Sequence, residues 1–292
     1  MKSQKKYPKA YSVEFFPPKS AESAAKLRET YLQLAPLKPC FASVTFGAGG
    51  STQERTFDTV REIKHETGID VAPHLSCIGS TKDNIRRILN NYKAQNIRHL
   101  VALRGDMPSG MREAGEFRYA NELVEFIRAE TGDHFFIEVA AYPEFHPQAP
   151  SAQADLLNFK RKVEAGADAA ITQYFYNPDA YFGFVESCEN LGLDLPIVPG
   201  IMPITNYTQL ARFSDACGAE IPRWIRKRLE AFGDDAKSIR AFGLDVTAKL
   251  CSDLLAGGAP GLHFYTMNQA GPTTTLWERL GIQSKGAATE KH

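Results

Sequence analysis

Short runs of β-branched and aromatic residues recur along the chain, and amphipathic segments separate them. Runs of this composition, bounded by turn-forming residues, are typical of buried strands. The early runs begin about 30 residues apart, which is the length of one strand–helix unit. The pattern predicts eight strands: Tyr11–Phe15, Phe41–Phe46, Asp70–Leu75, His99–Leu103, Phe135–Ala140, Ala169–Tyr174, Pro196–Gly200 and Gly261–Tyr265.

The intervening segments carry apolar residues at intervals of three and four, as an amphipathic helix does. This periodicity predicts helices over Ser20–Leu34, Thr52–Thr67 and Asp83–Gln95, the second with a polar start suited to an N-cap. Regular alternation of strand and helix indicates a parallel sheet. Because no dinucleotide glycine fingerprint follows the first strand, eight strands favour a closed (β/α)8 barrel, the TIM-barrel fold, over an open doubly wound sheet.

The spacing breaks once, between the seventh and eighth strands. The segment Ile201–Pro260 is about 60 residues long and predicts a helical insertion of two or more helices, punctuated by Pro203 and Pro222. Composition does not shift along the 292 residues, so we expect one domain over residues 1–292. The polar ends, residues 1–10 and 283–292, are expected to fray.

Charge and cysteine content exclude several function classes. Lys+Arg and Asp+Glu both number 34, so the chain lacks the basic excess that nucleic acids and anionic membranes attract. The five cysteines form no CxxC or Cys/His cluster, which argues against a structural metal site and a disulfide framework. No secretory signal or membrane span is apparent, so we expect a cytoplasmic protein.

Barrel enzymes place their chemistry at the C-terminal ends of the strands. The first strand ends in Glu14, inside the apolar run VEFFPP. Desolvation there would raise the pKa of the carboxyl and keep a proton available near neutral pH, which suits a general acid. A structural salt bridge inside the barrel explains a buried glutamate equally well.

Several later strand ends carry candidate ligand-binding groups. Thr45 opens a glycine-rich loop that allows close approach of a ligand, and His74 reads more readily as a structural residue than as a catalyst. Arg104 offers a fork for anions, with Asp106 across Gly105 as a paired acceptor. Gln173 can pair with an amide-like ring edge.

The helix after the fifth strand carries a cluster of polar residues. Asp155, Asn158, Arg161 and Lys162 recur at intervals of three and four and share roughly one face. Most such clusters are solvated helix faces. Two adjacent cations beside an Asn also suit a phosphate or pyrophosphate group.

Taken in order, the segments VEFFPP, SVTFGAGGS, APHLSC, HLVALRGD, SAQADLLNFKRKVEAGA, AITQYF, PGIMPI and HFYTMN resemble the catalytic barrel of the methylenetetrahydrofolate reductases. The resemblance runs from about Tyr11 to Ile282 and is to the short bacterial type, without the regulatory domain of eukaryotic members. It implies non-covalent FAD, NADH as the preferred co-substrate, and a homo-oligomer with a tetramer as the first expectation. The implied reaction reduces 5,10-methylenetetrahydrofolate to 5-methyltetrahydrofolate by a ping-pong cycle, supplying methyl groups for methionine synthesis.

The resemblance also assigns roles to individual residues. Glu14 would be the general acid, and Asp106 the carboxylate that stays ionised near the flavin and holds the pterin. Folate contacts would further include Gln173, Gln209 and Phe213, and Thr45 would lie on the nicotinamide side. The implied flavin contacts are Ala48, His74, Arg104, Gly105, Asp106, Ala120, Tyr142, His146, Ala149, Asp155, Asn158, Arg161 and Lys162.

Two positions depart from the family pattern. Phe46 stands where a tyrosine is common, which removes a hydroxyl contact to the flavin, and Gln269 stands where an arginine approaches the acidic side of the folate. Three other interpretations of the sequence remain open. They are a non-catalytic folate- or flavin-binding barrel, a flavin barrel of the proline dehydrogenase type, and a metal- or phosphate-dependent barrel lyase.

Overall fold

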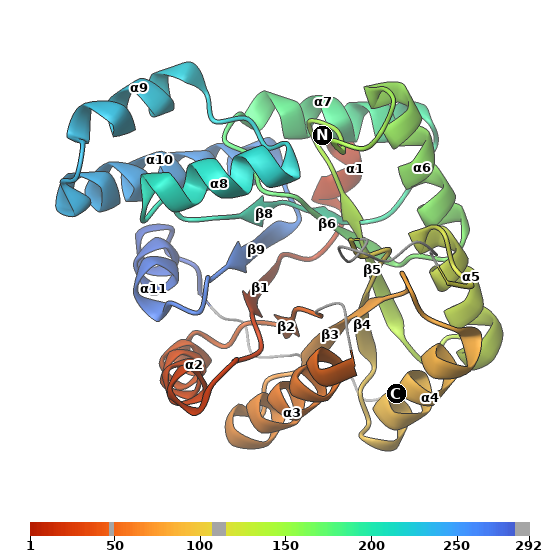
Figure 1. Cartoon of the computed structure of the whole chain (residues 1–292). Coiled ribbons are helices and arrows are strands. Elements are labelled where there is room, and N and C mark those ends of the chain that lie inside the picture. Colours follow the sequence, from red (N-terminus) through yellow and green to blue (C-terminus); the bar gives the residue numbers. More distant parts are fainter. Residues whose placement is uncertain (47–49, 107–114, 284–292) are drawn as a thin grey trace.

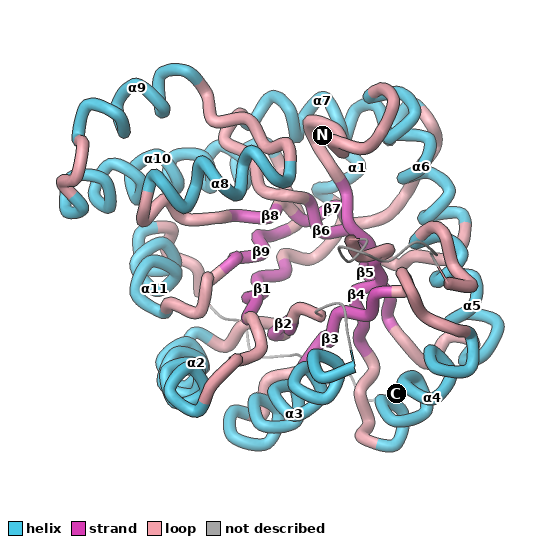
Figure 2. The backbone as a smooth tube through the Cα atoms, in the orientation of Figure 1, coloured by secondary structure: helices cyan, strands magenta, loops and turns pink. Residues whose placement is uncertain are grey.

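A computed structural model describes residues 1–46, 50–106 and 115–283; the side chains of residues 50–52 lie outside that description. Within it, one parallel sheet has the order β7-β6-β5-β4-β3-β2-β1-β9-β8. The strands lie at the centre of the molecule (Figure 2). Their bounds are β1 Ala10–Phe15, β2 Ala42–Val44, β3 Val71–Ser76, β4 His99–Leu103, β5 Phe136–Ala141, β6 Ala169–Thr172, β7 Ile197–Val198, β8 Gly200–Ile201 and β9 Gly261–Tyr265.

The two shortest strands close the barrel. β7 pairs with β6 and β8 pairs with β9, although only Pro199 separates them in the chain. Proline has no N–H to donate to a ladder, which divides one strand into two named pieces. Its carbonyl still accepts from the His263 amide at 3.0 Å. The predicted seventh strand is therefore present, and the closed (β/α)8 barrel is confirmed.

A ring of helices surrounds the strands (Figure 1). α10 packs against both α7 and α11, so it serves as the outer helix between β6 and β9 in the ring. The remaining helices of the predicted insertion are α8 (Tyr207–Cys217) and α9 (Arg223–Phe232), and α9 lies outside the ring in Figure 1. The ring comprises α2 Ala21–Leu34, α3 Gly50–Thr67, α4 Lys82–Ala94, α5 Ala120–Thr131, α6 Ala152–Glu164, α7 Pro178–Asn190, α10 Ala236–Gly257 and α11 Ala270–Arg279, and the 3-10 turn η1 (Ala35–Leu37) follows α2.

Strand alternation separates an apolar outer core from a partly polar lumen. Successive side chains of a strand point to opposite faces. In β5, Ile137 and Val139 join the main hydrophobic core, whereas the intervening Glu138 is buried on the other face. The same alternation leaves several polar side chains inside the barrel, namely Ser12, Glu14, Ser43, His74, Glu138 and His263. The lumen is thus built to hold charge and hydrogen bonds near the strand ends.

The N-terminal segment is ordered, contrary to the expectation that residues 1–10 fray. Residues Lys2–Lys5 form α1, and Gln4 is 2% exposed. Its amide donates to the Leu195 carbonyl at 3.1 Å and accepts from the Ile197 amide at 2.8 Å. These bonds satisfy backbone groups at the start of β7, which fixes the segment. Most of the other predicted tail, residues 284–292, lies outside the described residues.

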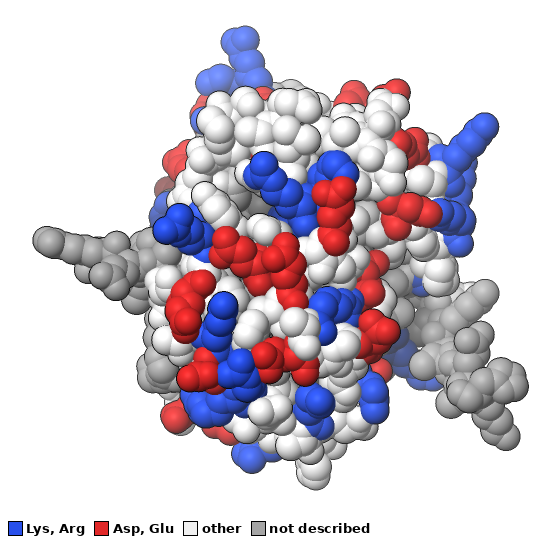
Figure 3. Space-filling view, turned by 90° about the vertical axis from the view of Figure 1, so that its right-hand side faces the viewer, with Lys and Arg blue, Asp and Glu red and all other residues white. Residues whose placement is uncertain are grey.

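The surface over α4, α5 and α6 mixes the two signs of charge. Lys and Arg side chains are interspersed with Asp and Glu across the face in Figure 3, and the formal net charge of the whole chain is zero. No helix in the described ranges is long and apolar enough to cross a membrane.

Candidate active site

A cavity of about 850 Å³ opens at the C-terminal ends of the strands, where barrel active sites lie. Its walls come from β1, from β3 to β6, from β9, from the residues that follow β2 and from α8 of the insertion. The fold therefore gathers residues that are widely separated in sequence. The predicted site residues among those lining it are Glu14, Thr45, His74, Gly105, Asp106, Tyr142, His146, Gln173 and Phe213.

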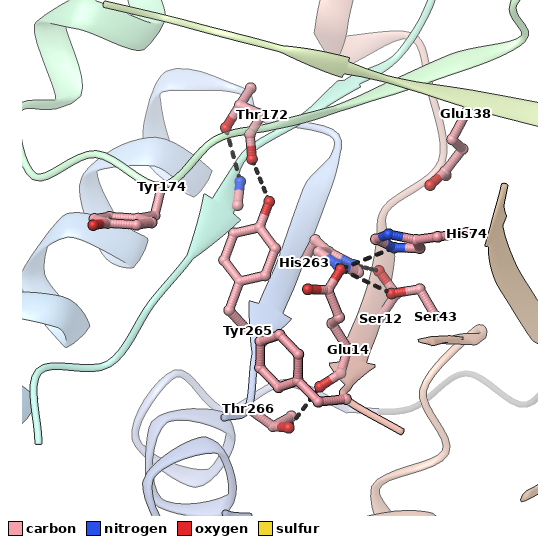
Figure 4. Close-up of polar contacts among 12 residues, drawn as sticks. Ser12, Glu14, Ser43, His74, Glu138, Thr172, Tyr174, His263, Tyr265 and Thr266 are labelled. Atoms are coloured by element: carbon pink, nitrogen blue, oxygen red, sulfur yellow. Dashed lines mark hydrogen bonds and ion pairs between the residues drawn. The ribbon is translucent and has the colours of Figure 1, made fainter. Parts of the chain in front are cut away.

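Glu14 lies at the base of this cavity, where β1 delivers it into the lumen. Its side chain is almost completely buried, and Ser43 Oγ donates to its Oε2 at 3.2 Å. His74 Nε2 lies 3.1 Å from the same oxygen, off the direction of a good hydrogen bond, and His263 Nε2 lies 3.4 Å away (Figure 4). The Glu14 carbonyl accepts from Thr266 Oγ1 at 2.6 Å, which anchors the backbone.

These contacts reverse the pKa shift that the sequence predicts for Glu14. Burial alone raises the pKa of the carboxyl, as expected. The electrostatic effects of His74 and His263, together with the hydrogen bond from His263, outweigh burial and lower the pKa from 4.5 to about 2. The prediction of a raised pKa is therefore wrong for the ligand-free chain. The salt-bridge interpretation is correct in its geometry, and it does not exclude catalysis.

The end of β4 binds its own loop rather than pairing Arg104 with Asp106. The Arg104 guanidinium donates to the Gly105 carbonyl and to Gln148 Oε1. Among the described residues no ion pair joins Arg104 to Asp106. Gly105 has φ +82°, and a Cβ there would lie 2.9 Å from Ser76 Cβ. Only glycine fits this turn, which leaves Asp106 exposed at the cavity edge.

The ends of β5 and β6 form the opposite wall of the cavity. The rings of Tyr142 and His146 meet edge-on at 4.6 Å. Burial, followed by the charges of Asp106 and Asp155, raises the pKa of Tyr142 to about 12. Gln173 accepts from the Tyr174 amide at 3.0 Å through its side-chain oxygen, so its NH2 group remains to donate to a ligand.

The polar face predicted for α6 contains one residue that holds the helix in place and others that can bind a ligand. Asp155 accepts from the His146 amide at 2.9 Å, which ties the helix to the cavity wall. Arg161 is exposed and donates to Asn158 at 2.8 Å. Lys162 is partly buried and donates to the Ala140 carbonyl. Burial lowers its pKa to about 8, against the opposing effect of Asp155.

Lys162 has no ion-pair partner among the residues that the structure describes. A desolvated ammonium without a carboxylate suits an anionic ligand, and an exposed guanidinium lies next to it in sequence. The donor set therefore fits a phosphate or pyrophosphate group. No cluster of His, Cys, Asp or Glu in the described ranges could hold a metal ion.

The remaining predicted residues lie away from the cavity lining. Ala120 is the first residue of α5, and the Ala149 amide donates to the His146 carbonyl. Gln209 and Gln269 are exposed, at the start of α8 and immediately before α11. Ala48 lies outside the described residues.

Sequence reasoning missed the groups that surround Glu14 from β1, β2 and β9. They are Ser12, Ser43, His263 and Tyr265. Ser12 lies opposite His263 and Glu14 opposite Tyr265 in the β1–β9 register. Period-two alternation from Glu14, applied across the strands that close the barrel, was the signal that could have found them.

Comparison with known proteins agrees with this geometry. The family model described as "Methylenetetrahydrofolate reductase" matches residues 1–281. The chain is 42% identical to 5,10-methylenetetrahydrofolate reductase of Escherichia coli (strain K12) over 93% of this chain and 90% of that one. It is 36% identical to "Methylenetetrahydrofolate reductase (NADH) 1" of Zea mays, over 94% of this chain and 48% of the plant protein.

A solved structure shows the same fold at low identity. An uncharacterised protein from Clostridium thermocellum, described as binding two copies of 5-methyl-5,6,7,8-tetrahydrofolic acid, superposes with a TM-score of 0.67 at 16% identity. The match covers 96% of this chain and 97% of that one.

Proposed function

The chain belongs to the methylenetetrahydrofolate reductase family, and we propose that it reduces 5,10-methylenetetrahydrofolate to 5-methyltetrahydrofolate with NADH through non-covalently bound FAD. The two substrates use the cavity in turn, and the product supplies methyl groups for methionine synthesis. The observation that carries the proposal is a buried carboxyl at the base of the cavity, with Oε2 held by the barrel. We further propose a homo-oligomer, first expected to be a tetramer, which light scattering on the purified protein would test.

The described residues fit FAD in two respects. Lys162 supplies a partly buried cation that forms no ion pair with a described residue, and Arg161 precedes it on the same helix. The cavity of about 850 Å³ reaches from the loop before α6 to Glu14. Bound there, FAD would pass hydride from the nicotinamide to the folate. Asn158, Arg161 and Lys162 would hold its phosphate and adenosine half.

Glu14 supplies the proton that the folate needs. Its Oε1 gives a proton to folate N10, the bond from the bridging carbon to N10 breaks, and the bridging carbon stays on N5 as an iminium cation. That cation then accepts hydride and becomes the methyl group. Because its partners lower the pKa of the Glu14 carboxyl well below its ordinary value, Glu14 must take up a proton as the folate enters. Displacing water from the cavity strengthens burial, which raises the pKa of the carboxyl.

Asp106 has a different task from Glu14. It is exposed at the cavity edge and no described cation pairs with it, so it can stay ionised beside the positive iminium. Gln173 presents its NH2 group to the pterin, and Phe213 packs against the folate from α8. Thr45 contacts the nicotinamide side. Gln209 and Gln269, which are exposed outside the cavity lining, would bind the tail of the folate.

The decisive experiment separates the two half-reactions of a Glu14→Gln variant by stopped-flow. Glutamine keeps an oxygen that can accept from Ser43 and His263, so the fold is retained while the proton is lost. We expect reduction of the flavin by NADH within about threefold of wild type. Oxidation of the reduced flavin by the folate should fall by roughly 10²–10⁴-fold, the usual contribution of a general acid.

Glu138→Gln is the matched control. Glu138 is also a buried lumen glutamate, 4% exposed, and its Oε1 lies 3.4 Å from His99 Nε2, yet it does not line the cavity. Both half-reactions should stay near wild type in this control. Equal losses in the two half-reactions of Glu14→Gln would contradict the role of Glu14 as the acid.

A further inference from the structure

Every hydrogen bond and ion pair of the Glu14 carboxyl that the structure shows ends on Oε2. Ser43, His74 and His263 converge on this one oxygen, from β2, β3 and β9 (Figure 4). The other oxygen, Oε1, takes no part in these contacts, and Glu14 lines the cavity. The barrel therefore treats the two oxygens of one carboxyl differently, holding one and leaving the other available.

His263 is completely buried and has a second contact of its own. It is 0% exposed, and its Nδ1 lies 2.7 Å from Ser12 Oγ. The Phe41 ring stacks at 6.0 Å and the Tyr265 ring meets the imidazole edge-on at 5.2 Å. The imidazole is therefore fixed between a hydroxyl on one nitrogen and a carboxyl on the other.

Hydrogen-bond chemistry selects one tautomer for this arrangement. A neutral imidazole carries one N–H and one lone pair. If Nδ1 carried the proton, the lone pair on Nε2 would face Oε2, which already accepts from Ser43, and two lone-pair atoms would oppose each other. With the Ser12 hydroxyl donating to Nδ1, Nε2–H points at Oε2. This tautomer suits both the carboxylate and a carboxyl protonated on Oε1.

We propose that Ser12 and His263 are positioning residues that hold Oε2 through a neutral Nε2–H donor, so that Oε1 alone carries the proton given to the folate. This inference rests on the proposed function. It adds which oxygen transfers the proton and which buried pair determines that choice. The other groups that face the carboxyl are Ser43, His74 and Tyr265, and Glu138 lies farther along the lumen.

The test compares His263→Leu with His263→Gln in the folate half-reaction across pH. A general acid loses activity as pH rises through its pKa, so the descending limb reports Glu14. Leucine removes a donor that favours the carboxylate, so the descending limb of the pH–rate profile should move to higher pH by about one unit. The rate of the folate half-reaction on the low-pH plateau should fall by roughly tenfold. Glutamine can donate from nearly the position of Nε2 and should restore the limb and most of the plateau.

Three comparisons keep the test decisive. Ser12→Ala leaves the imidazole in place and should shift the limb in the same direction as His263→Leu, which serves if the leucine variant fails to fold. An infrared titration of the ligand-free protein, with Glu14→Gln as the blank, should show the same order of Glu14 pKa values without any turnover. His99→Leu, which disturbs the similar His99–Glu138 pair, should leave the limb unmoved.

An unmoved limb and an unmoved infrared titration in both His263→Leu and Ser12→Ala would overturn the inference, and so would a glutamine variant as impaired as the leucine one. The proposed function has a separate failure, namely a Glu14→Gln enzyme that still reduces folate. In the Glu14→Gln background the addition of His263→Leu should cost nothing further in the folate half-reaction. A further loss there would show that His263 acts by another route.

Discussion

The structure makes a specific prediction about the charge of Glu14 before any substrate binds. A shift of its pKa from 4.5 to about 2 corresponds to about 3 kcal/mol in favour of the carboxylate. At pH 4.5 the neutral form should then be roughly 1 molecule in 300 instead of one in two. We therefore expect Glu14 to stay ionised in the ligand-free protein down to about pH 3.

The sign of the linked stability follows from the direction of this shift. The folded-state pKa lies below the value in the unfolded chain, so ionisation of Glu14 favours the folded state. That contribution is complete above the ordinary value of 4.5 and is lost as pH falls towards about 2. Protonation of Glu14 is consequently one cause of acid unfolding.

The assay is an infrared pH titration of the ligand-free protein, with Glu14→Gln subtracted as the blank. The band of a neutral carboxyl should be absent at pH 5 and pH 4 in wild type. Replacing His74 by Gln removes the imidazole whose Nε2 lies 3.1 Å from Oε2 and whose electrostatic effect is the largest of those that lower the pKa of Glu14. The band should then appear at clearly higher pH.

Two results would refute this reasoning. A neutral Glu14 in wild type at pH 5 would mean that burial outweighs the histidines. An unchanged titration in His74→Gln would mean that His74 does not stabilise the Glu14 carboxylate. Glu138→Gln is again the control, because it removes a buried glutamate from the same lumen without removing a contact of Glu14.

Three further predictions concern the walls of the cavity and its edge. Lys162→Met should weaken FAD binding by roughly 10–100-fold, and wild-type affinity should fall as pH rises through about 8, both followed by flavin fluorescence. Gly200→Ala should destabilise the fold by about 1–3 kcal/mol in urea titrations, because a Cβ would lie 2.2 Å from the Thr172 carbonyl and 2.6 Å from the Tyr265 ring. Gln269→Arg should lower KM for polyglutamylated folate by about two- to fivefold in steady-state assays, the size of an exposed charge pair.

The order of strands and helices was predictable from sequence because their periodicity is local. Each βα unit carries its own alternation and its own cap, as in Ser20, whose hydroxyl accepts from the Ser23 amide at the start of α2. The division of the seventh strand at Pro199 depends on the tertiary structure. Whether a missing N–H matters is decided by which neighbours pair on each side. The docking of Gln4 onto β7 likewise depends on a partner about 190 residues away.

The positions of the site residues along the strands were predictable from sequence, but the charge state of Glu14 was not. Glu14 could be placed at a strand end from its motif, and in the structure it lines the cavity. The pKa was wrongly predicted because His74 reaches Glu14 from β3 and His263 reaches it from 249 residues away. Propensity and composition do not contain that contact. It follows only from the β1–β9 register, which closure of the barrel imposes.

The polar lumen explains how one carboxyl can be both ionised at rest and useful as an acid. In an apolar lumen the Glu14 carboxyl would be neutral both before and after substrate binds, and its proton could lie on either oxygen. Here the donors on Oε2 stabilise the carboxylate until the cavity fills, and they occupy the oxygen that must not transfer the proton. Loss of cavity water then raises the pKa of the Glu14 carboxyl and favours its protonation. The proton binds to Oε1, because donors already occupy Oε2. Ser43, His74 and His263, the side chains that contact Oε2, thus determine both when Glu14 gains its proton and which oxygen carries it.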